Sequence, residues 1–397
     1  MTVQELDLMD ARAFADGIPY DYFARLRQEP GLPKATDGEG YEFWYLVRHA
    51  EVALAAKDND TFRSGPSTMT SVRQSSTGLP LITFLDGPEH ARLRKLVSKG
   101  FTPARLAKLE RPVGRIVDRI VGEVTAKAEF DLAEEIALQL PLEVLAELIG
   151  VQEADRPEII EWTRHTMNVG DPGYHHSTPE KARGAFQKLM EYFQELAARR
   201  AERPEDDLFS VLLETRLDGG EQMSRDEVAL FGTTLVGASE TTYCSVSGGV
   251  LALLRNPDQL ALVRDNRALL PLAVEEIIRY VTPATHFARQ VAKDTEIAGQ
   301  PIKAGERVVL WYTSANRDET VFDHPERFDV TRSPNPHVSF GGGGPHVCIG
   351  RGLANIELRL FFDAVLDRLS TLELAGEPVR SATNAMNAFR SMPARFR

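Results

Sequence analysis

A glycine-rich loop that ends in a cysteine lies near the C-terminal end of the chain. Phe340 is followed by four glycines, Pro345, His346, Val347 and Cys348. Consecutive glycines let the backbone adopt positive φ angles and approach a large flat group closely. An amphipathic stretch follows Cys348, and a cysteine at a helix N-terminus is favoured as a thiolate by unpaired N–H groups and the helix dipole. Such a soft sulfur in a tight loop suits a haem iron as proximal ligand.

Three other interpretations of this loop compete with haem binding. A phosphate-binding loop requires a GxxxxGK[ST] or GxGxxG pattern, and neither can be matched here. A zinc site built from His337, His346 and Cys348 lacks a paired Cys or His spacing and a fourth ligand nearby. An ordinary buried cysteine is the usual outcome for a lone Cys, and the loop by itself leaves that interpretation open.

A second group of reactive side chains lies between Val228 and Leu254, where Glu240 is the one charged residue in 27 positions. A membrane span is disfavoured because eight Ser, Thr and Glu side chains interrupt the apolar run. Residues 237–242 combine weak helix formers with hydroxyls that can bond back to the main chain, so we expect a long core helix that bends or opens there. This places a carboxyl beside the Thr241 hydroxyl; a buried Glu merely satisfied by neighbouring hydroxyls is the alternative.

These two features and three others together resemble the signatures of the cytochrome P450 family of haem-thiolate monooxygenases. The resemblance extends from about Thr83 to the end of the chain and is weaker before that. Any one of the motifs could arise by chance, but five in the family's order are very specific. In chain order they are His90-x-x-x-Arg94, the acid–alcohol stretch Gly237 to Thr242, Glu276-x-x-Arg279 with Tyr280 to Pro283, the segments 314–318 and 324–328, and the cysteine loop.

The match departs from the family's pattern at two positions. Phe340 and Cys348 are eight steps apart, whereas the family usually has seven, which leaves the packing of Phe340 against the sulfur open. Ala238 stands where the acid–alcohol motif usually has Gly, and it could alter the local helix opening where oxygen would bind.

The resemblance implies that the protein binds haem b (iron protoporphyrin IX), with Cys348 as the proximal iron ligand and Phe340 and Ala238 beside the cofactor. The family also carries basic partners for the two haem propionates. Buried propionates need charge-assisted donors, which Arg and His supply. The matching residues are His90, Arg94, Arg289 and His346.

Two further sets of roles follow from the resemblance. Thr241 and Glu240 are the predicted catalytic residues, which would deliver protons for the activation of O2. Glu276 and Arg279 would be a weak pair on an exposed helix, but apolar neighbours on both sides predict burial. In the family this pair holds the cysteine loop together with an arginine, which we assign to Arg327, in a structural role.

The substrate is the least determined part of this interpretation. Positions that face substrate in the family are mostly apolar here, as expected for a small lipophilic molecule of sterol, terpenoid, fatty-chain or natural-product type. The residues are Leu81, Ile82, Val236, Thr285, Phe287 and Met386.

Electrons must come from a separate protein, because the sequence contains no flavin or iron–sulfur segment. We expect NAD(P)H to supply them through a reductase and a ferredoxin or flavodoxin. Arg92, Lys95 and Lys99 would project opposite His90 and form a basic stripe, with Arg351 nearby, on which an acidic ferredoxin could dock; an ordinary solvated face is the alternative. Rival functions are a haem-thiolate isomerase or peroxygenase and a non-enzymatic haem sensor.

The composition restricts the partners and location of the protein. The 46 Lys and Arg against 58 Asp and Glu give a net charge of −12, which disfavours nonspecific binding to nucleic acid or anionic membranes. Only Cys244 and Cys348 are present, so a disulfide scaffold is excluded, and Cys244 is interpreted as core. The segment Met1 to Ala15 contains neither a signal peptide nor a membrane anchor, so we expect a cytoplasmic protein.

Amphipathic helices must position these side chains. Strand-like runs are short, at Phe43 to Val47 and Arg307 to Tyr312. The length of 397 residues alone suggests two or three domains, but no linker is visible. We therefore predict a mainly α protein with small β-sheets, folded as a single large P450-type domain over residues 1–397 that encloses haem. The expected helices include Pro103 to Ala126, Ala182 to Arg200, Pro257 to Tyr280 as two helices capped at Asn256 and restarted at Pro271, and Ile349 to Leu369.

Overall fold

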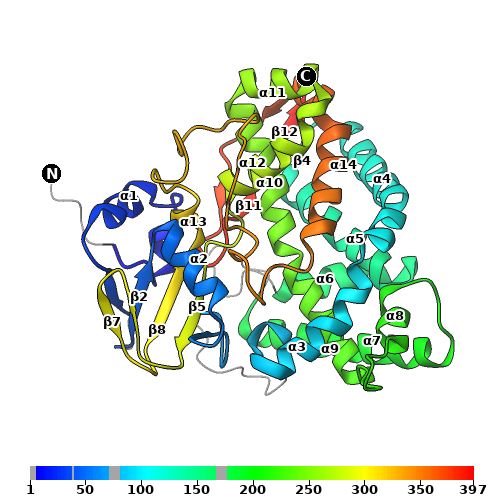
Figure 1. The fold of residues 1–397 in the computed structure, drawn as a ribbon. Helices are drawn as coiled ribbons and strands as arrows, with labels where there is room; N and C mark the ends of the chain where they lie inside the picture. Colours follow the sequence, from blue (N-terminus) through cyan, green and yellow to red (C-terminus); the bar gives the residue numbers. More distant parts are fainter. Residues whose placement is uncertain (1–5, 38–39, 71–80, 167–176) are drawn as a thin grey trace. The chain divides into compact units, whose positions relative to one another are not determined.

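The structure is a computed structural model that describes residues 6–37, 40–70, 81–166 and 177–397. It is mainly helical with small sheets, which confirms the predicted fold class (Figure 1). The chain divides into two compact units, neither of which is continuous in sequence. Unit 1 contains Met1–Ala91, Glu275–Cys348 and Ala382–Asn387, and unit 2 contains Arg92–Val274, Ile349–Ser381 and Ala388–Arg397. The single-domain interpretation stays a prediction.

Unit 1 is built on a five-stranded sheet with the strand order β1-β2-β8-β5-β3. Strand β2 runs parallel to β8, and the other neighbours in the sheet are antiparallel. The two predicted strands are therefore confirmed as central members of one sheet. The bounds are β1 Lys34–Thr36, β2 Glu42–Leu46, β3 Phe62–Arg63, β5 His286–Val291 and β8 Arg307–Trp311.

Strand β8 is buried on both faces, since alternate residues enter two different core clusters. Val308 and Leu310 belong to one cluster, which also contains Tyr312 just beyond the strand. Val309 and Trp311 belong to the other. Successive side chains of a strand point to opposite faces, so this alternation is what a central strand requires. The register with β5 opposes Phe287 to Leu310 and Arg289 to Val308, which places these residues on the same face as Val308 and Leu310.

Helices dominate unit 2, and the longest match the amphipathic stretches of the sequence. In α4 (Pro103–Thr125) the buried residues recur at steps of three and four, such as Val113, Ile116, Val117 and Ile120. Helix α4 packs on α14 (Arg351–Leu369), and α7 (Pro179–Glu202) packs on α9 (Arg225–Ala238). The predicted helices at these positions are confirmed.

The two helices predicted within residues 257–280 are confirmed as α11 and α12. The Asn256 side chain precedes α11 but makes no capping hydrogen bond to it; its Nδ2 donates to the Ala252 carbonyl at 2.8 Å instead. The remaining helices and strands are shorter. No helix in the described ranges is long and apolar enough to cross a membrane. The other elements are α1 Tyr20–Gln28, α2 His49–Lys57, α3 Gly87–Ser98, α5 Gln139–Ile149, α6 Arg156–Thr166, α8 Leu208–Glu214, α11 Pro257–Asp265, α12 Leu270–Val281, α13 Tyr312–Ala315, β4 Phe130–Asp131, β6 Thr295–Ile297, β7 Gln300–Ile302, β9 Leu372–Leu374, β10 Val379–Arg380, β11 Phe389–Ser391 and β12 Pro393–Phe396.

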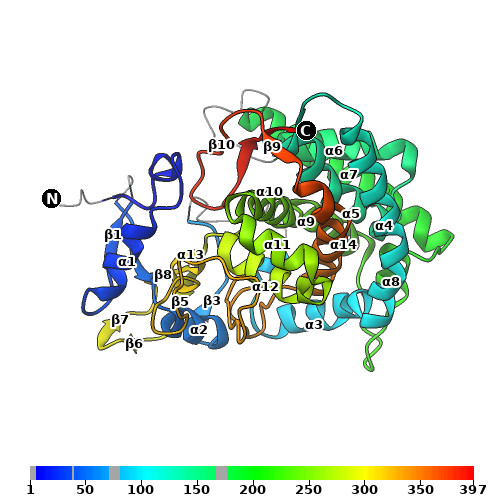
Figure 2. The same ribbon diagram turned by 90° about the horizontal axis from the view of Figure 1, so that it is seen from above.

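The apolar central stretch forms two helices in succession, α9 and α10 (Glu240–Arg255), separated at Ser239 (Figure 2). The Ser239 hydroxyl donates to the Val236 carbonyl at 2.6 Å, and the Thr241 hydroxyl donates to the Ala238 carbonyl at 3.0 Å. Hydroxyls that bond back to the main chain compete with the regular helical ladder, so the predicted local opening is confirmed. Beyond the break, α10 packs against α14, α5 and a π-helical turn at Ala133–Ala137.

Candidate active site

The cysteine loop closes on itself through one backbone hydrogen bond. The Cys348 N–H donates to the Phe340 carbonyl at 2.9 Å, and the Cys348 side chain is exposed and forms no disulfide with Cys244. Gly341, Gly342, Gly343 and Gly344 have φ angles of 96°, 71°, 100° and 73°. Residues with a Cβ rarely adopt these angles. The four glycines therefore allow this loop, which is one residue longer than is usual in the family it resembles, to close with the Cys348 N–H bonded to the Phe340 carbonyl.

The loop lies against α2, and one of its glycines is required by close approach as well as by its φ angle. A Cβ on Gly344 would lie 2.2 Å from the Ala56 carbonyl oxygen, far inside van der Waals contact. The start of the loop is held by Asn316, whose Oδ1 accepts the Val338 N–H at 2.8 Å. The position of the thiol is therefore set by α2 and by the segment after β8.

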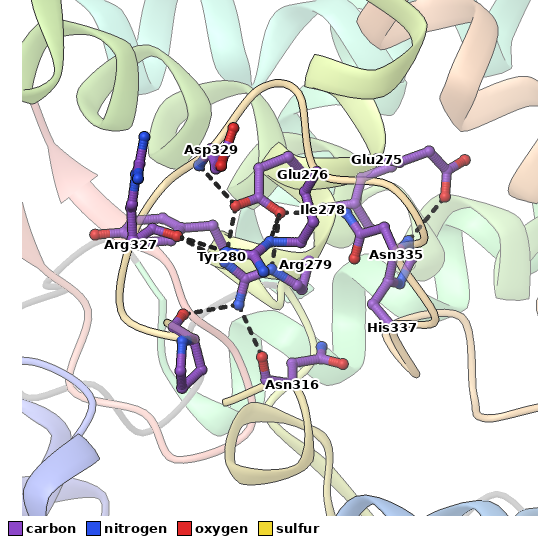
Figure 3. Close-up of polar contacts among 12 residues, drawn as sticks. Glu275, Glu276, Ile278, Arg279, Tyr280, Asn316, Arg327, Asp329, Asn335 and His337 are labelled. Carbon is purple, nitrogen blue, oxygen red and sulfur yellow. Dashed lines mark hydrogen bonds and ion pairs between the residues drawn. The ribbon is translucent and has the colours of Figure 1, made fainter. Parts of the chain in front are cut away.

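Glu276 and Arg279 form a fully buried ion pair on α12, with both side chains 0% exposed (Figure 3). Two parallel hydrogen bonds of 2.8 Å join the guanidinium to the carboxylate. Arg279 Nη1 also donates to the carbonyls of Asn316 and Pro325, each at 2.9 Å. A buried pair of this kind is tolerated when its remaining hydrogen bonds are satisfied, and here those bonds fasten α12 to the chain that leads to the cysteine loop.

The arginine that completes this cluster is Arg332, and the prediction of Arg327 is wrong. Arg332 Nε lies 3.2 Å from Glu276 Oε2, whereas Arg327 contributes only its carbonyl, which accepts from Arg279 Nη2 at 3.1 Å. The reason is the path of the backbone: Glu276 Oε1 accepts the Asp329 N–H at 2.9 Å, and the chain then turns so that Arg332 reaches the carboxylate. The spacing of a linear motif does not reveal such a turn.

A second contact joins α12 to the segment before the loop through His337, which the sequence suggests only as a possible zinc ligand. His337 Nε2 lies 2.8 Å from Glu275 Oε2, and the His337 side chain is 2% exposed (Figure 3). The Ser339 N–H donates to His337 Nδ1 at 3.3 Å, and the His337 ring is tilted against Phe340 with centroids 5.7 Å apart. Adjacent glutamates of α12 thus anchor successive parts of the loop segment.

Two predicted propionate ligands lie together within unit 1. The rings of His90 and His346 stack with centroids 4.0 Å apart and an interplanar angle of 30°. His346 Nε2 is buried, lies 3.6 Å from Asp86 Oδ1 and makes no hydrogen bond of normal length to any residue that the structure describes. Partial burial alone would raise the pKa of Asp86, but His346 and the N–H groups of Gly65 and Ser64 outweigh it and lower that pKa to about 2.

The surroundings of Arg289 show whether the predicted propionate ligands fit haem. Arg289 is buried, with an exposed fraction of 4%, and its Nη1 donates to the Ala288 carbonyl at 2.9 Å. Among the residues the structure describes, no carboxylate pairs with it. A buried charge without an opposite charge is strongly unfavourable, so this position requires an anion such as a propionate. Together with a loop thiol and the buried His346 nitrogen, this donor set fits haem.

Arg94, the fourth predicted propionate ligand, follows His90 by one turn on α3, which confirms the helix that the spacing required. His90 is buried with an exposed fraction of 3%, while Arg94 is partly buried. Cys244, interpreted as a core residue, is fully buried in α10.

Glu240 begins α10 at the break, and its carboxyl group has no hydrogen-bond or ion-pair partner in the described part of the chain. Burial raises the pKa of Glu240 from 4.5 to about 7, so both protonation states are accessible near neutral pH. Thr241 is partly buried, and Ala238 before the break is exposed. The Thr241 hydroxyl gives its hydrogen to Ala238, which leaves its oxygen to accept a hydrogen bond.

The predicted substrate-facing positions differ in exposure. Phe287 is 39% exposed, and Leu81, Ile82 and Met386 are partly buried. Val236 is 2% exposed and Thr285 is 0% exposed, so both are packed inside the protein. The Thr285 hydroxyl donates to the Asn384 carbonyl, and Ala284 forms a β-bridge with Met386, so unit 1 brings these two distant segments together.

His286 is a further buried residue that the sequence did not single out. Its Nδ1 lies 3.0 Å from the Asn384 carbonyl, its Nε2 lies 3.1 Å from the Thr70 hydroxyl, and its ring lies against Trp311 at 4.4 Å. Burial lowers the pKa of His286 to about 4, so the ring is neutral at physiological pH. It ties β5 to two neighbouring segments.

The proposed basic stripe is smaller than the sequence indicated. Arg92 forms an ion pair with Glu227 of α9, with both side chains partly buried. Lys95 and Lys99 are exposed. A docking surface on α3 would therefore rest on the two lysines.

The comparisons with known proteins define the class of this protein. The cytochrome P450 family model matches residues 11–395. A steroid C26-monooxygenase of Mycolicibacterium smegmatis is 36% identical over 97% of this chain and 92% of its own length, and a linalool 8-monooxygenase of Pseudomonas putida is 33% identical over 97% of each chain. The solved structure of a Mycobacterium marinum cytochrome P450 in complex with pseudoionone matches with a TM-score of 0.89 and 34% identity over 100% of both chains.

The chain belongs to the cytochrome P450 family. Its named relatives are monooxygenases, and it is an enzyme of that monooxygenase class that uses haem and O2. The sequence motifs and the full-length matches agree on this conclusion.

Proposed function

We propose that this enzyme hydroxylates a lipophilic small molecule of steroid or terpenoid type, using O2 and two electrons delivered from NAD(P)H by a separate redox protein. When bound, haem supplies the centre that binds O2 and inserts one of its oxygen atoms into a C–H bond, while the other leaves as water. The observation that carries the proposal is the break between α9 and α10. It is followed in the sequence by Glu240, whose pKa is raised, and by Thr241, whose hydroxyl oxygen can still accept a hydrogen bond.

Cys348 is the proposed iron ligand, and the residues around it keep the thiolate in place. The Phe340 carbonyl fixes the Cys348 backbone, and the buried Glu276–Arg279 pair fixes the segment leading to the loop. His90, Arg94, Arg289 and His346 are assigned to the propionates, since each is a cationic or hydrogen-bond-donating group.

Thr241 and Glu240 are assigned to proton delivery. With its hydrogen donated to Ala238, the Thr241 hydroxyl oxygen can accept a hydrogen bond from water and hold it in position. Glu240 can take a proton from solvent and pass it on, because a general acid is most effective when its pKa lies near the working pH, and that pKa is about 7.

The substrate class rests on apolar side chains and on the relatives. Phe287 and Leu81 present apolar surface at positions that face substrate in the family. The two named relatives act on a steroid and on linalool, both of which are largely hydrocarbon. We therefore propose a substrate with an extended hydrocarbon part, held by apolar contacts with few polar groups.

A ferredoxin, or less often a flavodoxin, is the proposed electron donor. Lys95 on α3 and Lys99 in the turn directly after it are exposed and present positive charge on a chain whose net charge is −12. An acidic partner would be steered to such a local basic surface. The content of two cysteines fits a reducing compartment, and we place the enzyme in the cytoplasm.

The function is tested by screening steroids and linear terpenoids such as linalool for the low-to-high-spin shift of the haem, and by measuring NADH, O2, H2O2 and product for the ligands that bind. We expect NADH-dependent O2 consumption coupled to a hydroxylated product. Thr241→Ala should keep the spin shift but divert about ten times more of the electrons to H2O2, in line with the loss of a positioned proton donor.

Thr241→Ser is the matched control, because it retains the hydroxyl and should remain coupled. Tight coupling of NADH use to product in the Thr241→Ala variant would contradict the assignment of Thr241. Substrate conversion without any reductant would instead indicate an isomerase or peroxygenase, and haem binding without turnover would indicate a sensor.

A further inference from the structure

Tyr312 is a buried residue that the sequence did not assign to any role. It follows the last residue of β8 and opens the short helix α13. Its exposed fraction is 1%, and it belongs to the same core cluster as Leu310 and Val338. Val338 lies two residues before Phe340, so the Tyr312 ring packs beside the segment that leads into the cysteine loop.

The phenol oxygen of Tyr312 is a buried polar atom that makes no hydrogen bond of good geometry in the described part of the protein, although the Arg289 guanidinium lies close enough to interact with it. A tyrosine hydroxyl normally finds a partner when it is buried, because an unpaired buried donor costs about 1–3 kcal/mol. Burial raises the pKa of Tyr312, so the group is an O–H donor at neutral pH. The site therefore offers one O–H donor that no group in the described residues accepts.

Arg289 lies next to this hydroxyl. The Tyr312 ring meets the Phe287 ring edge to face, with centroids 5.9 Å apart, and Phe287 and Arg289 share one face of β5. The positive charge of Arg289 also acts on the hydroxyl, where it lowers the pKa against the larger effect of burial. Two buried donors without an anionic partner thus meet on the face of the sheet that packs against the cysteine loop.

We propose that Tyr312 is a further haem-binding residue, whose hydroxyl donates a hydrogen bond to the propionate that pairs with Arg289. A propionate carboxylate can accept from both groups at once, because each of its oxygens accepts more than one hydrogen bond. One anion would thus supply both the opposite charge that Arg289 lacks among the described residues and an acceptor for the Tyr312 hydroxyl. The proposal rests on haem occupying the site with Cys348 as its ligand.

The chain provides a matched control in Tyr45. Its hydroxyl is also buried and makes no hydrogen bond to any described residue, but Tyr45 belongs to the core cluster that contains Trp311, on the other face of the sheet. Tyr312→Phe and Tyr45→Phe each remove one oxygen atom from a buried tyrosine, the first directly after β8 and the second in the neighbouring strand β2. A general effect of the lost hydroxyl on stability would act on both variants.

The experiment measures the rate at which the purified holoenzyme loses haem to excess apomyoglobin. It uses only protein whose ferrous carbon monoxide complex shows the red-shifted Soret band of thiolate ligation, so a failure of haem-thiolate binding is recognised separately. We expect Tyr312→Phe to lose haem about tenfold faster than wild type, as for one charge-assisted hydrogen bond, and Tyr45→Phe to match wild type. The propionate bending band in the resonance Raman spectrum should shift in Tyr312→Phe alone.

Unchanged haem loss and an unchanged propionate band in Tyr312→Phe would overturn the proposal. Equal acceleration in both variants would also overturn it, since the effect would then be one of packing. Faster haem loss with an unshifted propionate band would assign Tyr312 to the support of the sheet and reject the hydrogen bond.

Discussion

Replacing Glu240 by glutamine tests the electrostatic environment at the start of α10. Burial without a partner raises the pKa of Glu240 from 4.5 to about 7. The folded protein therefore holds this proton more tightly than the unfolded chain does. Below pH 4.5 the carboxyl is protonated in both states and costs nothing, but as the pH rises to 7 the unfolded chain ionises first and is favoured.

The size of the effect follows from the same two pKa values. At about 1.4 kcal/mol per pH unit, the free energy of unfolding falls by up to about 3 kcal/mol between pH 4.5 and 7 because of Glu240 alone. Glutamine does not titrate and keeps nearly the same shape. Glu240→Gln should therefore become more stable relative to wild type as the pH rises through this window, and the difference should level off above pH 7.

The assay is thermal unfolding of the holoenzyme at several pH values between 5 and 8, with the midpoint of the variant compared with that of wild type at each pH. A change of about 3 kcal/mol corresponds to about 3–4 °C for a chain of this length. Glu195→Gln on α7 is the matched control, because it makes the same substitution at an exposed position of a helix. A Glu240→Gln difference that is the same at pH 5 and pH 8 would refute the reasoning.

Two further substitutions test the cysteine-loop anchor and the electron-donor surface. Arg332→Gln should lower the free energy of unfolding by about 1–3 kcal/mol and reduce the haem content, because it removes one of the hydrogen bonds that satisfy the buried Glu276 carboxylate beside Arg279. Arg327→Gln should change the free energy of unfolding by less than about 0.5 kcal/mol, because only the Arg327 carbonyl takes part in the cluster. Urea unfolding and the haem-to-protein absorbance ratio measure both variants, and equal effects would contradict the assignment of Arg332. Charge reversal at Lys95 and Lys99 should slow reduction by an acidic ferredoxin about tenfold at low salt and less at high salt. Stopped-flow reduction measures this, with the exposed Arg183→Glu on α7 as control, and an unchanged rate would reject the docking surface.

Much of the helical framework could be predicted from the sequence because apolar periodicity is a local property. The buried positions of α4, such as Val113, Ile116 and Val117, recur at helical spacing along the chain, so the helix can be located without knowing its neighbours. The opening at Ser239 was equally predictable, since hydroxyls that bond to their own backbone act within one turn.

The partners of buried charges could not be predicted, because they depend on how distant segments meet. Arg327 and Arg332 are both plausible partners of Glu276 in the sequence, and only the turn after Asp329 selects Arg332. His337 meets Glu275 across 62 positions, and no local pattern marks that contact. Arg92 pairs with Glu227, 135 positions later in the chain, and no local pattern distinguishes it from the exposed lysines of the same segment.

By itself the sequence determined the family, and it predicted Cys348 as the iron ligand and Glu240 and Thr241 as the proton-delivery pair. These residues lie in motifs whose spacing is short and whose chemistry is carried by residue type. The tertiary structure alone decided which groups remain unsatisfied. Arg289 and Tyr312 are ordinary residues in the sequence, and they became candidates for one anion only when β5 and β8 paired and placed both on a buried face. The physical reason is that desolvation, which makes an unpaired charge or hydroxyl costly, exists only after distant segments have packed.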